Sequence, residues 1–176
     1  MSVTLTPLYD TEAISRRVCE LAADISRTYA GQELVAIIVM NGGIFFGADL
    51  LRGIKLPVCV DSLPAGSYSH HSSTGELTMR GKLKLEVQNR HVLLIDDILD
   101  TGFTLAELRK KILADGALSC RTCVLIDKDI PPEQKKAKPD WYGFRAPAEY
   151  LVGCGMDSDE LYRNLPDICI LRESEP

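Results

Sequence analysis

The sequence contains no apolar run long enough to cross a membrane, and residues 1–7 lack the basic and apolar regions of a signal peptide. Basic residues do not predominate either, because 20 lysines and arginines stand against 25 acidic residues and the net charge is −5. These absences argue against a membrane-spanning protein, a secreted protein and a protein with an overall basic surface for nucleic acid. We expect a cytoplasmic protein that has neither a membrane nor a nucleic acid as its partner.

The cysteines lack the spacing of a disulfide framework and lie in apolar surroundings. They are Cys19, Cys59, Cys120, Cys123, Cys154 and Cys169. We expect reduced, mostly buried thiols. Cys120 and Cys123 have the C-x-x-C spacing, but no second pair follows, so the sequence does not favour a metal or redox site there.

No internal repeat or low-complexity segment divides the 176 residues, of which 45% are hydrophobic, and we expect a single domain over residues 1–176. The first helical pattern begins with Asp10 or Thr11 as its cap. The expected elements are helices over residues 10–29, 44–51 and 104–114 and strands over residues 34–40, 58–60, 91–95 and 121–126. Strands that alternate with helices predict an α/β fold with a mainly parallel central sheet flanked by helices.

The most informative segment is residues 92–105, VLLIDDILDTGFTL. Its apolar start predicts a strand buried on both faces, and ligands bind at the carboxyl ends of such strands. Asp96 and Asp97 are adjacent on an extended chain and point to opposite sides, so only one can face a given ligand directly. Carboxylates suit sugar hydroxyls, a divalent cation or a proton in transit.

The turn from Asp100 to Thr104 has the composition of an anion site. It offers backbone N–H groups, two hydroxyls and a glycine free to adopt a positive φ, all at the start of a predicted helix. A phosphate monoester fits there, held by the N–H groups and the helix dipole. A simple helix cap at Asp100 or Thr101 would explain only one of these features.

The same segment resembles the phosphoribosyl-pyrophosphate-binding motif of the type I phosphoribosyltransferases: an apolar strand, two acidic residues, two apolar residues, Asp, a small residue, Gly and Thr. Further segments between about residues 34 and 171 resemble the hypoxanthine-guanine branch of that family. The resemblance implies a small hood to which residues 140–176 contribute, a mobile lid over residues 64–80, Mg²⁺ as the cofactor, and a homodimer or homotetramer. Uracil, adenine and orotate enzymes share the motif, so the flanking segments must select the substrate.

The resemblance assigns roles by position. Asp100 takes the proton from the purine N7. The metal-binding residues are Asp96 or Asp97, near the ribose, and Asp157, near a second cation; which of Asp96 and Asp97 contacts the metal stays open. The residues that bind phosphoribosyl pyrophosphate are Asn41, Gly42, Gly43, Ser67, Tyr68, Asp96, Asp97, Thr101, Gly102, Phe103, Thr104 and Arg163.

The purine-binding residues implied by the resemblance are Lys128, Tyr150 and Leu151. Lys128 donates to the 6-oxo group, Tyr150 stacks on the base, and the backbone of Leu151 contacts the base edge. Adenine would present its 6-amino group to the lysine and leave two donors facing each other. Taken without the resemblance, Lys128 is typical of a surface lysine and Tyr150 of a core aromatic.

Two loops complete the expected site. In the family, the turn that matches residues 41–43 binds pyrophosphate, and we predict a cis or otherwise strained peptide between Asn41 and Gly42, although an ordinary turn also fits this sequence. Residues 66–77 resemble the lid that shields a cationic sugar intermediate from water, but a flexible surface loop has the same composition. His70 and His71 match no family role, and we expect solvated side chains.

The expected activity is the transfer of the 5-phosphoribosyl group from phosphoribosyl pyrophosphate to N9 of hypoxanthine, and of guanine, giving IMP or GMP and pyrophosphate. The alternative is a nucleotide-sensing regulator that keeps the phosphoribosyl pocket and exposes a basic face. A ribose-phosphate diphosphokinase is disfavoured because the chain is short and has no P-loop motif. The sequence leaves open the preference among hypoxanthine, guanine and xanthine.

Overall fold

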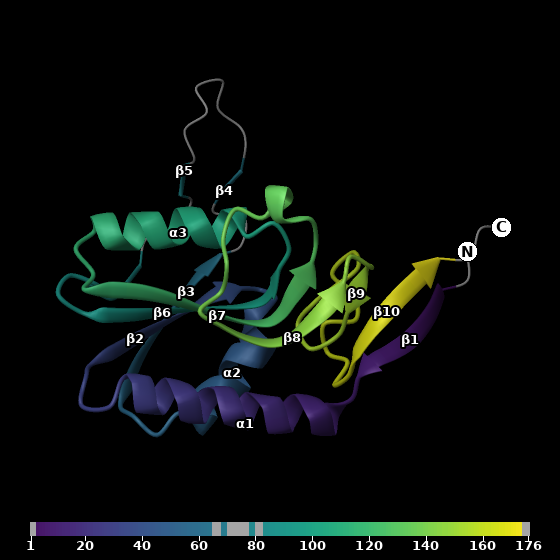
Figure 1. Cartoon of the computed structure of the whole chain (residues 1–176), viewed down its shortest axis with the longest axis horizontal. Helices are drawn as coiled ribbons and strands as arrows, with labels where there is room; N and C mark the ends of the chain where they lie inside the picture. Colours follow the sequence, from purple (N-terminus) through teal and green to yellow (C-terminus); the bar gives the residue numbers. More distant parts are fainter. Residues whose placement is uncertain (1–2, 65–67, 70–77, 80–82, 174–176) are drawn as a thin grey trace.

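The fold was established from a computed structural model, which describes residues 3–64, 68–69, 78–79 and 83–173 (Figure 1). The elements in chain order are β1 (Val3–Tyr9), α1 (Thr11–Thr28), β2 (Leu34–Met40), α2 (Gly43–Gly53), β3 (Val58–Pro64), β4 (Tyr68–Ser69), β5 (Thr78–Met79), β6 (His91–Leu99), α3 (Phe103–Ala114), β7 (Ser119–Asp129), a 3-10 turn (Pro132–Gln134), β8 (Trp141–Pro147), β9 (Leu151–Val152) and β10 (Ile168–Glu173).

The central sheet has five parallel strands in the order β3-β2-β6-β7-β8. Helices α1 and α2 cover one face and α3 covers the other (Figure 1). β2 shows why its sequence is apolar throughout: Leu34 and Ala36 pack in the cluster that includes α1 and α2, whereas Val35 and Ile37 pack in the cluster that includes α3. The predicted α/β fold with a parallel, doubly covered sheet is confirmed.

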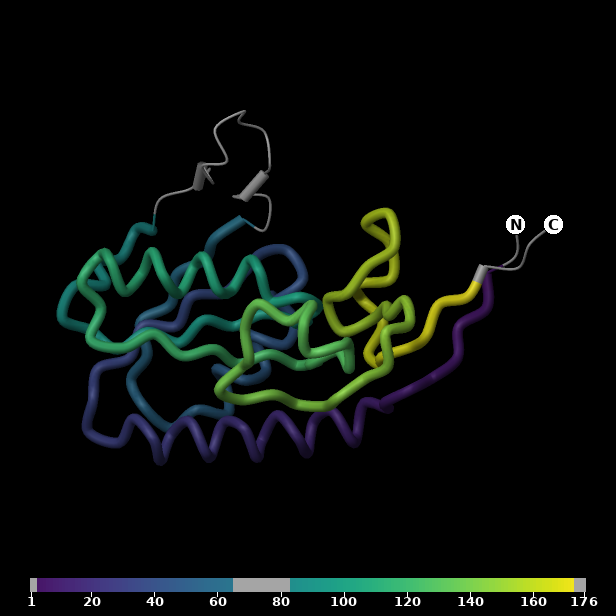
Figure 2. The backbone as a smooth tube through the Cα atoms, turned by 45° about the horizontal axis from the view of Figure 1, so that its top comes forward, coloured from purple at the N-terminus to yellow at the C-terminus, as the bar shows by residue number. Residues whose placement is uncertain are grey.

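A second, antiparallel sheet in the order β1-β10-β9 forms the hood. β1 runs along β10, so segments from opposite ends of the sequence lie side by side at one end of the molecule (Figures 1 and 2). Residues 141–147 form β8 in the central sheet. The irregular segment between β9 and β10, residues 153–167, belongs to the hood and lies beside the edge of the central sheet (Figure 1).

Local signals in the sequence set several element boundaries. Asp10 caps α1, because its carboxylate accepts a hydrogen bond of 2.8 Å from the Ala13 N–H. β6 continues to Leu99, whereas the sequence predicted its end at residue 95. The apolar residues Ile98 and Leu99 keep the strand paired with β7, so Asp96 and Asp97 lie inside β6.

Cys120 and Cys123 lie on β7 with their side chains in different hydrophobic clusters. Burial raises the pKa of the Cys120 thiol to about 12. The geometry therefore agrees with buried, unreactive thiols at this C-x-x-C spacing. Among the described residues, no helix is long and apolar enough to span a membrane.

Candidate active site

A cavity of about 450 Å³ opens at the carboxyl ends of the central strands, beside the hood. Its lining comes from five parts of the chain: Val39, Met40, Asn41 and Gly42; Pro64; Asp96, Asp97 and Ile98; Thr104; and Asp157, Glu160 and Arg163. A smaller cavity of about 120 Å³ adjoins it and is lined by residues of the 96–105 segment. The fold thus brings together segments that are more than 100 residues apart, at the sheet edge where ligands bind in such folds.

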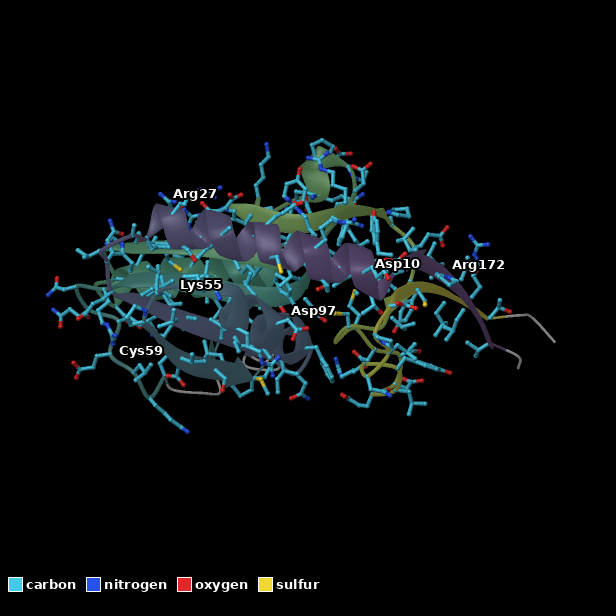
Figure 3. The ribbon with its side chains drawn as sticks, turned by 90° about the horizontal axis from the view of Figure 1, so that it is seen from below. Asp10, Arg27, Lys55, Cys59, Asp97 and Arg172 are labelled. Carbon is cyan, nitrogen blue, oxygen red and sulfur yellow. The ribbon has the colours of Figure 1, made fainter. Side chains whose placement is uncertain are left out.

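The Asp96 and Asp97 carboxylates occupy different places in this cavity. Asp97 is buried against Gly42, where a Cβ atom would lie 2.2 Å from Asp97 Oδ2. Asp96 lines both cavities. Figure 3 shows Asp97 where the central sheet meets the hood.

Neither carboxylate forms an ion pair within 4.0 Å among the described residues. Loss of solvation, followed by the charge of Asp97, holds the pKa of Asp96 well above its ordinary value. Burial also raises the pKa of Asp97, and the more distant Arg163 charge opposes this rise only in part. Two crowded carboxylates that lack a cation are suited to bind one.

The turn after β2 corrects one prediction. The cis peptide bond joins Met40 and Asn41, not Asn41 and Gly42. Gly42 already has helical dihedral angles, φ −57° and ψ −49°, and the Ile44 N–H donates to the Asn41 carbonyl at 3.3 Å. The Asn41–Gly42 peptide therefore belongs to the first turn of α2, and the change of direction falls one residue earlier.

The turn from Asp100 to Thr104 has the geometry of an anion cradle. Gly102 adopts φ +79° and precedes the first turn of α3, which contains no acidic side chain. The Phe103 N–H donates to the Thr101 hydroxyl at 3.4 Å, and the Ala106 N–H donates to the Gly102 carbonyl at 3.0 Å. The start of α3 thus faces the smaller cavity with an uncompensated helix dipole.

Asp100 and Lys128, which are 28 positions apart in the sequence, meet at the ends of β6 and β7. Lys128 Nζ lies 4.0 Å from Asp100 Oδ2, and the Asp100 side chain is 61% exposed. A cationic donor and a solvent-accessible carboxylate therefore stand side by side, at the start of the turn formed by residues 100–104, which we call the phosphate turn after its predicted ligand.

The hood contributes an arginine whose charge is already paired. Arg163 donates to Glu160 Oε2 through Nε and Nη2, at 3.2 and 2.8 Å, and to the Gly155 carbonyl through Nη1 at 2.8 Å. Nη2 also lies 2.9 Å from Asp157 Oδ1. The sequence does not single out Glu160, because a spacing of three residues predicts a pair only within a helix and this segment is an irregular turn.

Tyr150 and Leu151 stand at the start of β9. Tyr150 is 54% exposed, which excludes a core position, and its hydroxyl donates to the Asp157 carbonyl at 3.1 Å. Leu151 is buried, and its backbone pairs with Ile170 of β10. An exposed aromatic ring that is fixed through its hydroxyl is free to stack on a ligand.

Glycine allows the hood to approach the central sheet. Gly155 has φ +105°, and a Cβ atom there would lie 2.0 Å from the Gly42 carbonyl oxygen. Most of the non-glycine residues with positive φ also lie in the hood: Cys154, Asp159, Glu160 and Tyr162. Such strained backbone persists only where the surrounding structure holds it, and it concentrates at ligand sites.

Two parts of the predicted site are less complete. Ser67, His70 and His71 lie outside the described residues, and for Tyr68 only the backbone, in β4, is described. Within the described part of the chain, no group of three or more His, Cys, Asp or Glu side chains could hold a metal ion. A cation at Asp96 and Asp97 would thus take further ligands from a substrate or from water.

Comparison with known proteins gives a consistent result. Residues 5–159 match the family model described as the phosphoribosyl transferase domain. The chain is 38% identical over 167 residues to a hypoxanthine-guanine-xanthine phosphoribosyltransferase of Tritrichomonas foetus, covering 95% of this chain and 91% of that protein. It is 35% identical to a hypoxanthine-guanine phosphoribosyltransferase of Aquifex aeolicus, covering 94% of each.

The fold is likewise similar to a solved structure. This is a crystal structure of a hypoxanthine-guanine phosphoribosyltransferase from Bacillus anthracis with a HEPES molecule in its active site. The TM-score is 0.87 at 32% sequence identity, and the match covers 98% of this chain and 100% of that one.

Proposed function

Because the chain belongs to the phosphoribosyl transferase domain family, we propose that it is a purine salvage enzyme. It transfers the 5-phosphoribosyl group from phosphoribosyl pyrophosphate to N9 of hypoxanthine or guanine and releases pyrophosphate. The observation that carries this proposal is the meeting of the phosphate turn with the Asp100–Lys128 pair, 4.0 Å apart, at one sheet edge. The sugar donor and the base acceptor are thereby recognised side by side.

The 5′-phosphate takes the cradle formed by Thr101, Gly102, Phe103 and Thr104. Its charge is balanced by the backbone N–H groups at the start of α3 and by the helix dipole. The ribose then extends toward Asp96, which lines both cavities and can accept hydrogen bonds from ribose hydroxyls. The donor is held at both ends, which places its anomeric carbon at a fixed position.

Asp100 and Lys128 act on the base. The purine N7 and O6 atoms lie on the same edge of the ring, so one pair of neighbouring groups can engage both. Lys128 donates to O6, and Asp100 accepts the proton from N7 as N9 attacks the anomeric carbon. Tyr150 stacks on the ring, and the backbone at Leu151 contacts its edge. Adenine is rejected because its 6-amino group cannot accept a hydrogen bond from Lys128.

The pyrophosphate leaves as the anomeric carbon develops oxocarbenium character. Arg163 is the hood residue that receives it, and the 41–43 turn provides backbone N–H groups. We propose Mg²⁺ as the cofactor, held by the unpaired Asp96 and Asp97, with Asp157 for a second ion. When bound, Mg²⁺ supplies the positive charge that the leaving diphosphate requires.

The test is an assay with Mg²⁺, phosphoribosyl pyrophosphate and each of hypoxanthine, guanine, xanthine and adenine, followed by chromatography of the nucleotides. We expect IMP and GMP, and no AMP. A Lys128→Met variant should lose activity with the 6-oxopurines, whereas Lys138→Met, which changes an exposed lysine of the β7–β8 connection, should keep it. Formation of no nucleotide from any base would refute the proposal and favour the nucleotide-sensing regulator.

We also propose a homodimer or homotetramer, which light scattering of the purified protein tests. The cytoplasmic location stays a prediction from the sequence.

A further inference from the structure

The connection between β7 and β8 packs against the back of the phosphate turn. The Lys136 N–H donates a hydrogen bond of 2.7 Å to the Thr101 carbonyl. A Cβ atom on Gly102 would lie 3.0 Å from Ala137 Cβ and 3.1 Å from Ala137 N, so the connection touches the turn closely at this glycine. Lys136 and Ala137 line neither of the two cavities described above; with Lys128 they border a separate cavity of about 550 Å³.

One ion pair anchors this connection to the central sheet. Lys135 Nζ pairs with the Asp127 carboxylate, and only 16% and 6% of the two side chains are exposed. Asp127 lies near the carboxyl end of β7, a strand paired on both sides, with β6 and with β8. A buried pair of this kind is costly to break, because either partner left alone is an uncompensated charge. Lys135 is therefore fixed to the most rigid part of the fold.

Peptide geometry transmits this support to the cradle. In a trans peptide the C=O of one residue and the N–H of the next point in opposite directions. The Thr101 carbonyl points toward Lys136, so the Gly102 N–H points away from the connection, to the side where the smaller cavity lies. A loss of the Lys136 contact frees this peptide to rotate, since glycine permits many backbone conformations.

We propose that Asp127 and Lys135 are positioning residues for the 5′-phosphate: their ion pair holds the connection that orients the Gly102 N–H into the cradle. The inference rests on the proposed function, because it deepens the same site. The neighbouring residue Lys128 meets Asp100, so β7 and the connection that follows it support the turn at two successive residues, Asp100 and Thr101. The strand that selects the base thereby also orders the sugar-phosphate site.

The test uses titration calorimetry on the full chain to measure the affinities of two ligands. Ribose 5-phosphate occupies the cradle, and magnesium pyrophosphate does not. In Lys135→Gln and in Asp127→Asn, we expect the Kd of ribose 5-phosphate and the KM of phosphoribosyl pyrophosphate to rise about tenfold, the loss typical of one hydrogen bond to a charged group. The Kd of magnesium pyrophosphate should stay within about twofold of the wild-type value, which is below the effect of one hydrogen bond.

Lys138→Gln is the matched control, since it removes the same charge from the same connection, and Lys138 forms no ion pair with the described residues. It should leave both affinities unchanged, and Lys135→Arg, which keeps the pair, should restore most of the ribose 5-phosphate affinity. If a single variant fails to fold, the double variant Asp127→Asn with Lys135→Gln, which buries no unpaired charge, takes its place with the same expected loss.

Unchanged ribose 5-phosphate affinity in the variants, or an equal loss for both ligands, would overturn the inference. A wild-type protein that binds neither ribose 5-phosphate nor phosphoribosyl pyrophosphate would overturn the proposed function together with it.

Discussion

The two sides of the candidate active site are built in different ways. The sheet side is regular. Asp96 and Asp97 lie on β6 near its end, Asp100 directly follows β6, and Lys128 lies near the end of β7. The hood side is irregular, and much of its backbone between residues 153 and 162 has positive φ. The sheet side holds two carboxylates, Asp96 and Asp97, that form no ion pair with the described residues, whereas the hood side pairs Arg163 with its own carboxylates.

This difference predicts how each side responds to a ligand. The sheet side has excess negative charge, so it gains stability when a cation binds. The hood side has its charges balanced, so a ligand there must replace an existing partner of Arg163. Chemistry should therefore depend mainly on the sheet side, and ligand exchange on the hood side.

The largest expected effect is a loss of catalytic rate when the sheet side is changed. Asp100→Ala removes the proposed proton acceptor of the sheet side and should lower kcat for hypoxanthine about 10²–10³-fold, the usual contribution of general base catalysis. The KM of phosphoribosyl pyrophosphate should change little. Steady-state kinetics measures both.

Asp129→Ala is the control for this rate effect, because Asp129 is an exposed carboxylate at the end of the neighbouring strand β7. It should keep wild-type turnover. Wild-type turnover in Asp100→Ala would rule out Asp100 as the base.

The second prediction tests the close contact between the hood and the 41–43 turn. Gly155→Ala forces a side chain to φ +105° and against the Gly42 carbonyl oxygen, a backbone atom that cannot move aside cheaply. We expect a loss of about 3 kcal/mol in unfolding free energy, and hence a melting temperature lower by about 6–12 °C in calorimetry.

Gly31→Ala is the control that separates the cost of a positive φ from the cost of a steric clash. Gly31 has φ +74°, but nothing lies within 4 Å of its would-be Cβ atom. It should lose only about 1 kcal/mol. Equal melting temperatures for the two variants would mean that the hood does not press on the 41–43 turn.

The same division separates what the sequence predicts from what it does not. The apolar strands, the Asp10 cap and the glycine of the phosphate turn follow from local chemistry, so periodicity and turn residues predict them. The placement of Lys128 next to Asp100 follows from the parallel order of β6 and β7, which the βαβ pattern also indicates.

The hood resists this kind of prediction. Its sheet includes β1, paired with β10 across the whole length of the chain, and no local pattern reports so distant a pairing. Without the resemblance Tyr150 is typical of a core aromatic, yet its side chain is 54% exposed and its hydroxyl donates to the Asp157 carbonyl. The cis peptide bond lies at Met40–Asn41, one residue before the predicted Asn41–Gly42 bond, and α2 already begins at Gly43.

The third prediction concerns the unpaired charge of the sheet side. The pKa of Asp96 in the folded protein is raised above its ordinary value of 3.8, so the folded state retains protons that the unfolded state releases. Stability therefore falls as pH rises above about 4, and Asp96→Asn removes this cost. At pH 7.5, and without ligand, we expect the variant to be about 1 kcal/mol more stable than the wild type in urea unfolding, although inactive.

The gain should shrink as pH is lowered and vanish below about 3, where Asp96 is mostly neutral in both states. Asp115→Asn, which changes an exposed carboxylate at the end of α3, should show no such gain. A gain that does not depend on pH would assign the effect to packing and not to charge. Addition of Mg²⁺ with phosphoribosyl pyrophosphate should raise the melting temperature of the wild type more than that of Asp96→Asn.

The smallest expected effect tests the balanced charge of the hood. Glu160 is 74% exposed and accepts two hydrogen bonds from Arg163, so its carboxylate occupies donors that a diphosphate would use. Exposed pairs are weak, typically below about 1 kcal/mol, and Glu160 can turn into solvent when a ligand arrives. Glu160→Gln should therefore tighten magnesium pyrophosphate binding by about two- to fivefold, because Arg163 loses a competing partner.

Glu149→Gln, which removes an equal charge from a hood residue that pairs with Arg172, should leave this affinity unchanged. If Glu160 instead holds Arg163 in its binding position, product inhibition by pyrophosphate will weaken in Glu160→Gln, and the contrast between an unpaired sheet side and a self-neutralised hood will no longer explain ligand exchange.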